Sequence, residues 1–318
     1  MLLSVVWIII GLAGLFFGGN WLVKGAARLA QTLGLSPIVI GLTIVAYGTS
    51  TPELLVSLQA ALGGNADISM GNVVGSNIAN IGLIIGVSAL IFPMAVQLQF
   101  LRREVPIMIG ISLLFFLLAS DGAIGSLDGL LFAVGAVAYT ALSYLITKRN
   151  EPELVRQTQE FTLTIAKPTN RLPGDLLLVV TGTAILLVGS DRLVVGAVEI
   201  ATALNVPQIV IGITLVAVGT SLPEFATSVI AAFKRESEIA IGNVVGSNIF
   251  NILGILGITA LITPINVNPR LLQVDMFVML GFAVALFIFC LNRKISRREA
   301  TLLLAAYIAF TVFTFSPR

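Results

Sequence analysis

The chain has 318 residues, of which 57% are hydrophobic and only 11% are charged, whereas an average soluble domain is roughly one quarter charged. It contains no histidine and a single cysteine, Cys290. These counts exclude the usual zinc and copper sites, the usual acid/base side chain at neutral pH and any internal disulfide. A metal site in this sequence must be built from oxygen ligands, which suit hard cations such as Na⁺ and Ca²⁺.

Apolar stretches of about 20 residues recur along the chain, a length that matches the ~30 Å hydrocarbon core of a membrane. They predict an all-α integral membrane protein with ten transmembrane helices. The predicted spans are residues 3–21, 38–62, 69–92, 105–119, 128–147, 175–190, 207–233, 239–262, 274–291 and 300–315. Because no Lys or Arg precedes Lys24, the first stretch lacks the basic region of a signal peptide, and we interpret it as a true span.

The basic residues predict how these spans are oriented. If the N-terminus is outside, 15 of the 18 Lys and Arg residues fall on the inner side, including Lys24 and Arg28 in the first loop, and 3 fall on the outer side, including Arg192. Cytoplasmic loops carry such an excess of positive charge. We therefore expect both termini outside and the protein in the cell (plasma or inner) membrane.

The charged, proline-bearing residues 148–173 form the longest gap between predicted spans. With the orientation above, this gap is a cytoplasmic linker between two halves, residues 1–147 and 174–318. It is too short for a regulatory domain, which typically needs about 50 residues or more.

The most informative feature is an internal repeat whose two copies are separated by a constant offset in residue number. The segment GLTIVAYGTSTPE, Gly41–Glu53, recurs as GITLVAVGTSLPE, Gly212–Glu224, and GNVVGSNI, Gly71–Ile78, recurs identically and at the same offset as Gly242–Ile249. With five spans in each half, the second copy must enter the membrane upside down, which predicts two inverted five-helix repeats. Such repeats are typical of secondary transporters, in which the substrate site lies near the membrane midplane between the halves.

Glu53 and Glu224 are the only acids that we expect deep within apolar spans, each about 15 residues from the start of its helix, or roughly 22 Å at 1.5 Å per residue. A charged acid at a helix centre costs ~2.5–3.5 kcal/mol even on conservative insertion scales. Two protonated carboxyls that merely link helices are the alternative interpretation. The duplication of these acids in a setting of Gly, Ser and Thr favours a cation site.

Prolines precede both acids and predict a break in each helix. Pro52 and Pro223 cannot donate an amide hydrogen, and they clash with the carbonyls four residues earlier. The stretches Ala46–Thr49 and Ala217–Thr220 should therefore expose unpaired carbonyl oxygens, and each Glu should begin the following half-helix, where the helix dipole favours a carboxylate. A proline kink without a bound ion is the alternative. The hydroxyls that would complete an oxygen cage are those of Thr49, Ser50, Thr220 and Ser221.

Polar side chains occur at helical spacing in and after the GNVVGSN motif and its copy. A serine and an asparagine four residues apart share one helix face, and we expect this face to line the site, whereas the asparagine next to each serine projects elsewhere. The lining residues are Ser76 and Asn80 with their copies Ser247 and Asn251, and the asparagines that project elsewhere are Asn77 and Asn248. The glycines of the motif form small-xxx-small patterns, which are typical of close helix packing.

The paired GxTxVAxGTSxPE and GNVVGSN stretches resemble the α-repeats of the cation/Ca²⁺ exchanger superfamily, in particular its prokaryotic Na⁺/Ca²⁺ branch, over nearly the whole chain. The ion ligands that this resemblance implies are Glu53, Glu224, Ser50, Ser221, Ser76 and Ser247, with backbone oxygens of Ala46, Thr49, Ala217 and Thr220, and with Asn80 and Asn251 in the middle of the site. Many exchangers have aspartate where this chain has Asn251, as K⁺-dependent members do, so the asparagine argues against K⁺ cotransport. Members that exchange H⁺ for Ca²⁺ usually show GNxxE in place of GTSxPE, which favours Na⁺ as the driving ion.

The sequence thus predicts a secondary active antiporter that exchanges Na⁺ for Ca²⁺ by alternating access and extrudes Ca²⁺. We expect no cofactor beyond the transported ions, no nucleic acid and no obligatory protein partner in the lipid bilayer. An H⁺/Ca²⁺ or other cation/proton antiporter is the alternative. A passive channel fits the duplicated carboxylates poorly. An intramembrane enzyme or an ATPase lacks support, because the sequence has no His, no P-loop pattern and no aspartate-phosphorylation motif.

Overall fold

The computed structural model describes residues 2–149, 172–204 and 217–315, and nearly all of them are helical. Within these ranges, six helices are long and apolar enough to cross a membrane, or seven if the bent pair Pro37–Thr49 and Thr51–Leu62 counts as one span. The prediction of a helical protein that crosses the membrane several times is confirmed.

The elements follow one another in the same order in the two parts of the chain, and those labelled η are π-helical turns. The first part contains α1 (Leu2–Leu33), α2 (Pro37–Ile40), η1 (Gly41–Val45), α3 (Ala46–Thr49), α4 (Thr51–Leu62), α5 (Ala66–Ala79), η2 (Asn80–Ile85), α6 (Gly86–Ile91), β1 (Met94–Ala95), η3 (Phe100–Glu104), α7 (Val105–Ala119), β2 (Ala123–Ile124) and α8 (Ser126–Arg149). The second part contains α10 (Leu172–Ala203), α12 (Ala217–Thr220), α13 (Leu222–Phe233), α14 (Ser237–Phe250), η5 (Asn251–Leu256), α15 (Gly257–Ile262), β3 (Ile265–Asn266), η6 (Leu271–Asp275), α16 (Met276–Cys290), β4 (Lys294–Ile295) and α17 (Arg297–Phe315).

Element boundaries repeat at the same offset as the sequence. The first residues of α5 and α14 are separated by the offset that relates Gly41 to Gly212, and so are their last residues. The same holds for α4 and α13, for η2 and η5, and for α7 and α16. The repeat in the sequence is therefore also a repeat of local structure, down to the π-helical turns.

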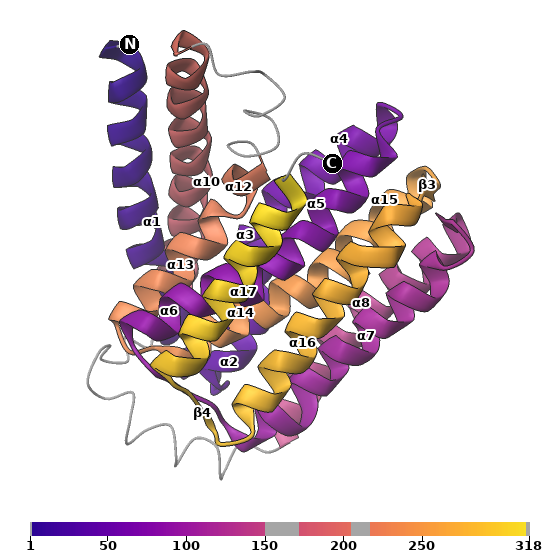
Figure 1. Ribbon diagram of the computed structural model, residues 1–318. Coiled ribbons are helices and arrows are strands. Elements are labelled where there is room, and N and C mark those ends of the chain that lie inside the picture. Colours follow the sequence, from indigo (N-terminus) through magenta and orange to yellow (C-terminus); the bar gives the residue numbers. More distant parts are fainter. Residues whose placement is uncertain (1, 150–171, 205–216, 316–318) are drawn as a thin grey trace.

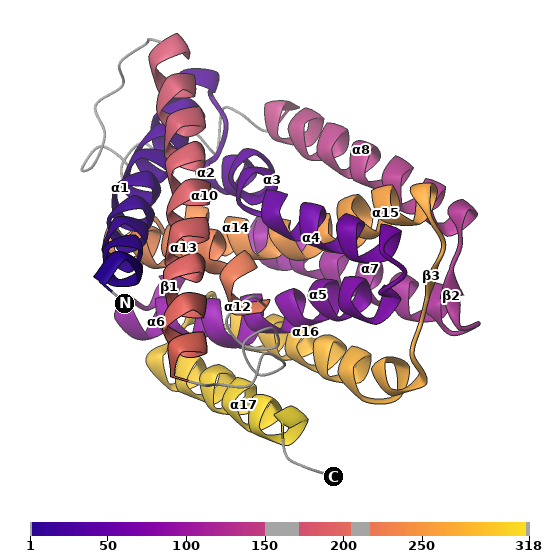
Figure 2. The ribbon, with the colours of Figure 1, turned by 90° about the horizontal axis from the view of Figure 1, so that it is seen from above.

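α1 and α10 lie side by side as a pair that stands apart from the main bundle (Figure 1), and the view from above shows the same pairing (Figure 2). Glycines make this contact close. A Cβ atom on Gly182 would lie 2.5 Å from the backbone nitrogen of Leu22, and one on Gly18 would lie 2.6 Å from that of Leu186. The two backbones can approach in this way because glycine has no side chain.

These two helices correct the predicted spans 3–21 and 175–190. α1 and α10 each contain 32 residues, so Lys24 and Arg28 lie within α1, and Arg192 lies within α10, not in loops. The prediction ended each span where charge begins, but a helix of this length is about 48 Å long. It therefore extends well beyond the ~30 Å hydrocarbon core and carries its charged residues with it.

The other predicted span limits agree with the structure only in part. The span predicted at 105–119 coincides with α7, although the helical backbone already begins at Phe100 through η3. α8 ends at Arg149, and most of the predicted linker, 148–173, lies outside the described residues, as do residues 207–216 of the seventh predicted span.

α14 is enclosed by its neighbours, and every residue from Ile239 to Ile249 is buried. It packs against η1 and α2, and a Cβ atom on Gly246 would lie only 2.4 Å from the carbonyl oxygen of Leu42. Gly242 approaches Ile38 in the same way, at 2.7 Å from its carbonyl oxygen. The close helix packing predicted for this glycine motif is therefore present in the second part of the chain.

The identical motif in α5 has different surroundings. Gly71 and Gly75 are exposed, and no described atom lies within 4 Å of a Cβ position built on either residue. The segment that the repeat offset equates with the partners of Gly242 and Gly246, residues 209–213, lies outside the described residues. The close approach of Gly71 and Gly75 therefore stays a prediction.

Two short antiparallel ladders join the parts of the chain. β1 pairs with β4, with Met94 opposite Ile295, and β2 pairs with β3, with Ile124 opposite Ile265. At the offset of the sequence repeat, β1 is equivalent to β3 and β2 is equivalent to β4. The pair β1–β4 is therefore equivalent to the pair β3–β2, in which the strands of the two parts of the chain have exchanged roles. Contacts that recur with exchanged partners are what a two-fold relation produces.

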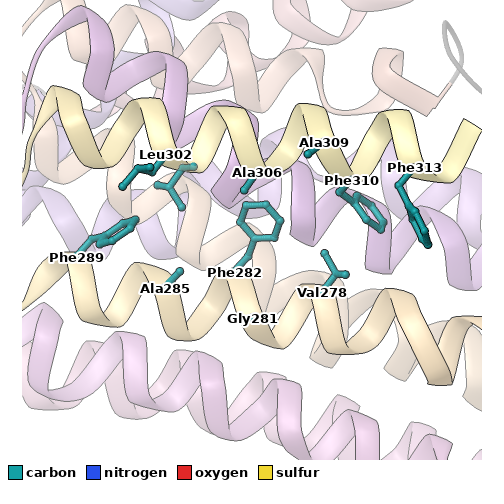
Figure 3. A pocket seen from close by; sticks show the side chains of 11 residues that line it. Val278, Gly281, Phe282, Ala285, Phe289, Leu302, Ala306, Ala309, Phe310 and Phe313 are labelled. Atoms are coloured by element: carbon teal, nitrogen blue, oxygen red, sulfur yellow. The ribbon is translucent and has the colours of Figure 1, made fainter.

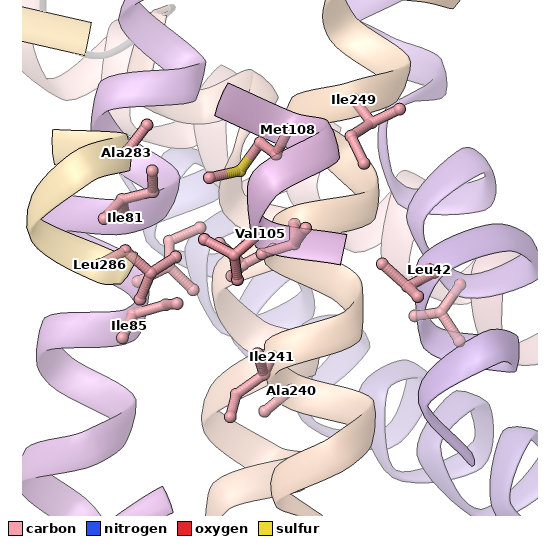
Figure 4. Packing of buried hydrophobic residues seen from close by; sticks show 14 of the residues in the cluster. Leu42, Ile81, Ile85, Val105, Met108, Ala240, Ile241, Ile249, Ala283 and Leu286 are labelled. Carbon is pink, nitrogen blue, oxygen red and sulfur yellow. The ribbon is translucent and has the colours of Figure 1, made fainter. Parts of the chain in front are cut away.

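Buried aliphatic side chains fill the space between the helices of the bundle. Ile81 and Ile85 from η2 face Val105 and Met108 from α7 and Leu286 from α16 (Figure 4). Close packing of this kind holds backbones at fixed separations. It therefore fixes the start of η2, where Asn80 lies.

We expect Gly246→Ala to destabilise the fold, because its methyl group would overlap the backbone of Leu42. Overpacking of this kind typically costs about 1–3 kcal/mol, which should lower the midpoint of thermal unfolding in detergent. Gly110 on α7 is the matched control, because no described atom lies within 4 Å of its Cβ position and alanine is favoured over glycine in a helix. Equal melting temperatures for Gly246→Ala and Gly110→Ala would contradict the packing of α14 on η1.

Candidate ion-binding site

Each helix that carries a predicted acid is interrupted at a serine. Ser50 separates α3 from α4 with φ −82° and ψ 11°, and Ser221 separates α12 from α13 with φ −87° and ψ 5°. The helical axis bends by 46° at Ser50. The prolines at the second position of α4 and α13 explain the breaks, because proline has no amide hydrogen for the preceding turn.

The prediction of an unpaired carbonyl at Ala46 is wrong. Its oxygen accepts hydrogen bonds from the backbone nitrogen of Ser50, at 2.9 Å, and from the hydroxyl of Thr49, at 3.2 Å. The helix breaks at Ser50, so the turn that begins at Ala46 is still closed. Ala217 begins α12 at the position equivalent to Ala46, which begins α3.

Glu53 and Glu224 both lie in the first turn of the half-helix that follows the break, as predicted. Each is only 1% exposed. The Oε1 atom of Glu53 accepts a hydrogen bond of 3.0 Å from Ser221, and the Oε1 atom of Glu224 accepts one of 2.8 Å from Ser50. Each carboxyl group is thus held by a hydroxyl from the other part of the chain.

The serines of the second motif extend this arrangement. Ser76 and Ser221 lie 3.2 Å apart, and the hydroxyl of Ser50 also lies 3.0 Å from that of Ser247. Two hydrogen-bonded chains result, each consisting of a glutamate, a serine at a helix break and a serine of the GNVVGSN motif. The structure therefore brings together the glutamates and the four serines that the sequence predicted for one site.

The predicted threonines face asparagines that our sequence analysis did not single out. Thr49 donates to Oδ1 of Asn243 at 3.1 Å, and Thr220 donates to Oδ1 of Asn72 at 3.5 Å. The amide of Asn72 in turn donates to the backbone oxygen of Glu53 at 3.1 Å. These asparagines follow the first glycine of each GNVVGSN motif, and their duplication was the signal that could have identified them.

Asn243 makes contacts equivalent to those of Asn72, and both asparagines also donate to a serine. Asn243 donates to the backbone oxygen of Glu224 at 3.3 Å and to the hydroxyl of Ser228 at 3.0 Å, and Asn72 donates to Ser57 at 2.9 Å. Each asparagine therefore fixes the backbone that carries an acid and also accepts from a threonine. The two asparagines thus help to fix the positions of the backbone segments that carry the carboxyl groups.

A second set of asparagines forms a closed group between η2 and η5. Asn80 donates to Oδ1 of Asn248, and Asn251 donates to Oδ1 of Asn77, each at 2.9 Å. Asn77 and Asn248 also donate to each other's backbone oxygens, each at 3.3 Å. Asn77 and Asn248, which we expected to project away from the face that lines the site, thus bond to asparagines of the other part of the chain, a contact that the faces of single helices do not reveal.

These amide contacts fix which end of Asn80 and Asn251 is free. Because the amide nitrogen of each is used by an asparagine of the other part of the chain, its carbonyl oxygen is turned away from that contact. Asn80 follows Ser76 by one helical turn, and Asn251 follows Ser247 in the same way. The free oxygens therefore lie on the helix faces that carry the serines of the site.

Four buried oxygen atoms of this cluster have no hydrogen-bond partner among the described residues. They are Oε2 of Glu53, Oε2 of Glu224, Oδ1 of Asn80 and Oδ1 of Asn251. A buried acceptor without a partner costs about 1–3 kcal/mol, and a charged one costs more. Carboxylate and amide oxygens are the ligands of Na⁺ and Ca²⁺, so a bound cation can satisfy the whole set.

Comparisons with known proteins agree with this geometry. The model of the family described as sodium/calcium exchanger protein matches residues 3–145 and 175–316. The sodium/calcium exchanger MaX1 of Methanosarcina acetivorans is 36% identical over 340 residues, with 97% of each chain covered. The chain belongs to the sodium/calcium exchanger family.

Other relatives of this chain are similar to it over nearly its full length. The inner membrane protein YrbG of Escherichia coli is 35% identical over 294 residues, which cover 92% of this chain and 90% of YrbG. The solved structure of the sodium-calcium exchanger NCX_Mj, soaked with zero Na⁺ and Ca²⁺, matches with a TM-score of 0.85 and 32% identity over 98% of this chain and 99% of NCX_Mj. The family resemblance inferred from the two motifs is confirmed.

Other buried acids of this exchanger-family chain have local partners. Glu104, which is 2% exposed, accepts from Arg103 at 2.6 Å and from Tyr139 at 2.8 Å. Asp175, which is 1% exposed, accepts from Thr32 at 2.8 Å. Both lie near the start of a helical segment, Glu104 just before α7 and Asp175 in the first turn of α10. They are buried without lying deep within an apolar span, which is the position predicted for Glu53 and Glu224 alone.

The hydrogen bonds among Asn77, Asn80, Asn248 and Asn251, here called the asparagine group, lead us to predict a role for Asn77 in ion binding. Asn77→Leu would leave the amide of Asn251 without its acceptor, so the carbonyl oxygen of Asn251 would no longer be held toward the site. We expect the variant to fold but to bind Ca²⁺ about 5- to 10-fold more weakly, the loss of roughly one oriented hydrogen bond. The measurement is the rise in melting temperature with Ca²⁺ concentration.

Asn20→Leu is the control for this variant, because the Asn20 amide bonds to Phe16 within its own helix and lies on α1. It should keep the response of the native chain to Ca²⁺. A Ca²⁺ response of Asn77→Leu equal to that of Asn20→Leu would show that the asparagine group has no influence on the ion.

Proposed function

We propose that this chain is a secondary active antiporter that exchanges Na⁺ for Ca²⁺ across the cell membrane by alternating access, with Ca²⁺ extrusion driven by inward movement of Na⁺. The observation that carries the proposal is the set of four buried oxygens, from Glu53, Glu224, Asn80 and Asn251, that have no partner among the described residues and belong to side chains bonded across the two parts of the chain. The relatives MaX1 and NCX_Mj, whose names describe sodium/calcium exchange, support the choice of ions.

The ligands that we propose for the ions are the side chains of the cluster and the backbone at the helix breaks. They are Glu53, Glu224, Ser50, Ser221, Ser76, Ser247, Asn80, Asn251, and the oxygens of Thr49, Thr220, Ala46 and Ala217. The last two contribute least in the described state, because the carbonyl of Ala46 already accepts two hydrogen bonds.

The negative charge of the two carboxylates determines which ions can replace one another in the site. Two ionised carboxylates balance one Ca²⁺ or two Na⁺, so the two kinds of ion compete for the same negative charge. An empty site would leave two buried carboxylates without a counter-charge, and moving them between the faces of the membrane in that state is costly. The protein therefore changes sides only when it is loaded, which makes the exchange obligatory. The transported ions are its only inorganic partners in this scheme, and it needs no cofactor and no protein partner.

The proposed architecture is ten transmembrane helices in two inverted repeats, residues 1–147 and 174–318, joined by a cytoplasmic linker and with both termini outside. Three observations support it: the constant offset of element boundaries, the exchange of partners in both strand ladders, and the exchange of partners in every hydrogen bond between the two motifs. Inverted repeats place their substrate site where the halves meet.

Proteoliposomes test the proposal and separate it from the H⁺-coupled alternative. We expect uptake of ⁴⁵Ca²⁺ when an outward Na⁺ gradient is imposed and no uptake when a pH gradient replaces it. Uptake driven by the pH gradient alone would favour the cation/proton antiporter. Calcium flux without any counter-ion gradient would instead indicate a channel.

Glu53→Gln and Glu224→Gln should each abolish this Na⁺-dependent uptake, because the site would carry only one negative charge against a divalent ion. Both variants should still insert and purify, since glutamine keeps the size of the side chain and can accept from the same serine. Asp121→Asn is the control, because it removes one acid from an exposed loop. Retained transport in both glutamine variants would refute the proposed site.

Asn251→Asp should change ion preference or make exchange depend on pH. An ionised aspartate would raise the charge of the site to about −3 and would lose the amide that donates to Asn77. A protonated aspartate could donate instead, which would link the geometry of the site to pH. An Asn251→Asp protein with the native ion preference and pH profile would show that this residue lies off the ion pathway.

A further inference from the structure

A groove lined by apolar side chains runs between α16 and α17, away from the ion site. α16 packs against α7 and α5, whereas α17 packs against α6 and η2, and the space left between the two helices has a cavity volume of about 650 Å³. Figure 3 shows Phe282 across the middle of the groove, Phe289 near one end and Phe313 near the other. Small residues, among them Gly281 and Ala306, leave it open.

The dimensions of the groove match one leaflet of a membrane. Its lining extends from Val278 to Phe289 on α16 and from Leu302 to Phe313 on α17, or about 17 Å along each helix at 1.5 Å per residue. Half of the ~30 Å hydrocarbon core is about 15 Å. A groove of this length and chemistry fits a single acyl chain.

Basic residues gather at one end of the groove. α16 ends just after Phe289, and α17 begins five residues before Leu302. Residues 291–299, which comprise this connection and the first three residues of α17, contain four basic side chains and one acid. The basic residues are Arg293, Lys294, Arg297 and Arg298, and all four are exposed. The acid, Glu299, is engaged by the backbone nitrogen of Ser296 and by Asn292.

One of these arginines is kept in an unfavourable backbone conformation. Arg293 has φ +62°, in the left-handed region, and the equivalent position in the first part of the chain is Gly122, with φ +96°. Glycine adopts such angles without steric cost, whereas arginine does not. The turn after α16 therefore presents a positive charge that its repeat counterpart lacks.

We propose that the groove between α16 and α17 binds an anionic phospholipid, with one acyl chain along Phe282 and the phosphate at Arg293, Lys294 and Arg298. Arg297 is less available, because it donates to the backbone oxygens of Leu90 and Ile91. Anionic lipids are concentrated in the cytoplasmic leaflet and attract basic residues there. The assignment of the phosphate to that leaflet rests on the orientation proposed above. The lipid site itself does not depend on whether the chain transports ions.

The repeat provides a matched pair of variants for the test. Arg235 shares the left-handed conformation of Arg293, with φ +62°, and its counterpart in the first part is also a glycine, Gly64. Arg235 lies between α13 and α14, with its guanidinium 5.3 Å from the ring of Phe92. Arg293→Gly and Arg235→Gly therefore remove the same charge and the same strain at two places, and only the first lies at the groove.

The experiment is native mass spectrometry of the purified full chain, titrated with phosphatidylglycerol or phosphatidylcholine of identical acyl chains. We expect the native chain to bind phosphatidylglycerol at least about tenfold more tightly. A basic side chain near an anionic headgroup contributes about fivefold in affinity, so Arg293→Gly and Arg298→Gln should each lose about that factor, while Arg235→Gly should not. Arg293→Gly should also melt at a higher temperature, which shows that lost binding is not lost folding.

Gly281→Leu tests the acyl-chain half of the proposal. No described atom lies within 4 Å of a Cβ position on Gly281, so leucine fills the groove without displacing protein, and binding of both lipids should fall by at least about fivefold. Equal binding of the two lipids to the native chain, or equal effects of Arg293→Gly and Arg235→Gly, would overturn the proposal. Dimers that exclude both lipids would do so as well, because a second copy of the chain would then cover the groove. None of these results depends on whether the chain exchanges Na⁺ for Ca²⁺.

Discussion

The constraint on which the rest of this structure depends is the lack of hydrogen-bond donors around two buried carboxyl groups. Each of Glu53 and Glu224 has one oxygen bonded to a serine and one oxygen without a described partner. The serine always comes from the other part of the chain. Neither part therefore holds a complete site, and any movement of one part against the other changes the ligands that are presented to an ion.

Asparagine has a further role in this arrangement because it can donate and accept. Asn251 uses its amide hydrogen to hold Asn77, which leaves a neutral oxygen for the ion, and Asn80 does the same with Asn248. An ionised aspartate could supply the oxygen, but it could not supply the donor. In the proposed site the two carboxamides would add ligands without adding charge, and the glutamates alone would set the balance between one Ca²⁺ and two Na⁺.

The sequence predicted the parts of the site that depend on one helix and missed those that depend on two. The duplicated motifs identified both glutamates and the four serines, and helical spacing placed Asn80 on the face of Ser76. The same spacing placed Asn77 on another face, because a helical wheel does not show that its partner lies in the other part of the chain. The limits of α1 were missed for a different reason, since charged residues within a helix look like a loop when only hydropathy is considered.

The repeat also bears on how the proposed exchanger could change sides. GNVVGSNI occurs in both α5 and α14, and each glutamate is bonded to a serine of the other part of the chain. Equal sequences have equal intrinsic preferences, so two arrangements in which the two parts exchange their environments would be close in free energy. Such closeness is the condition for the alternating access that we propose.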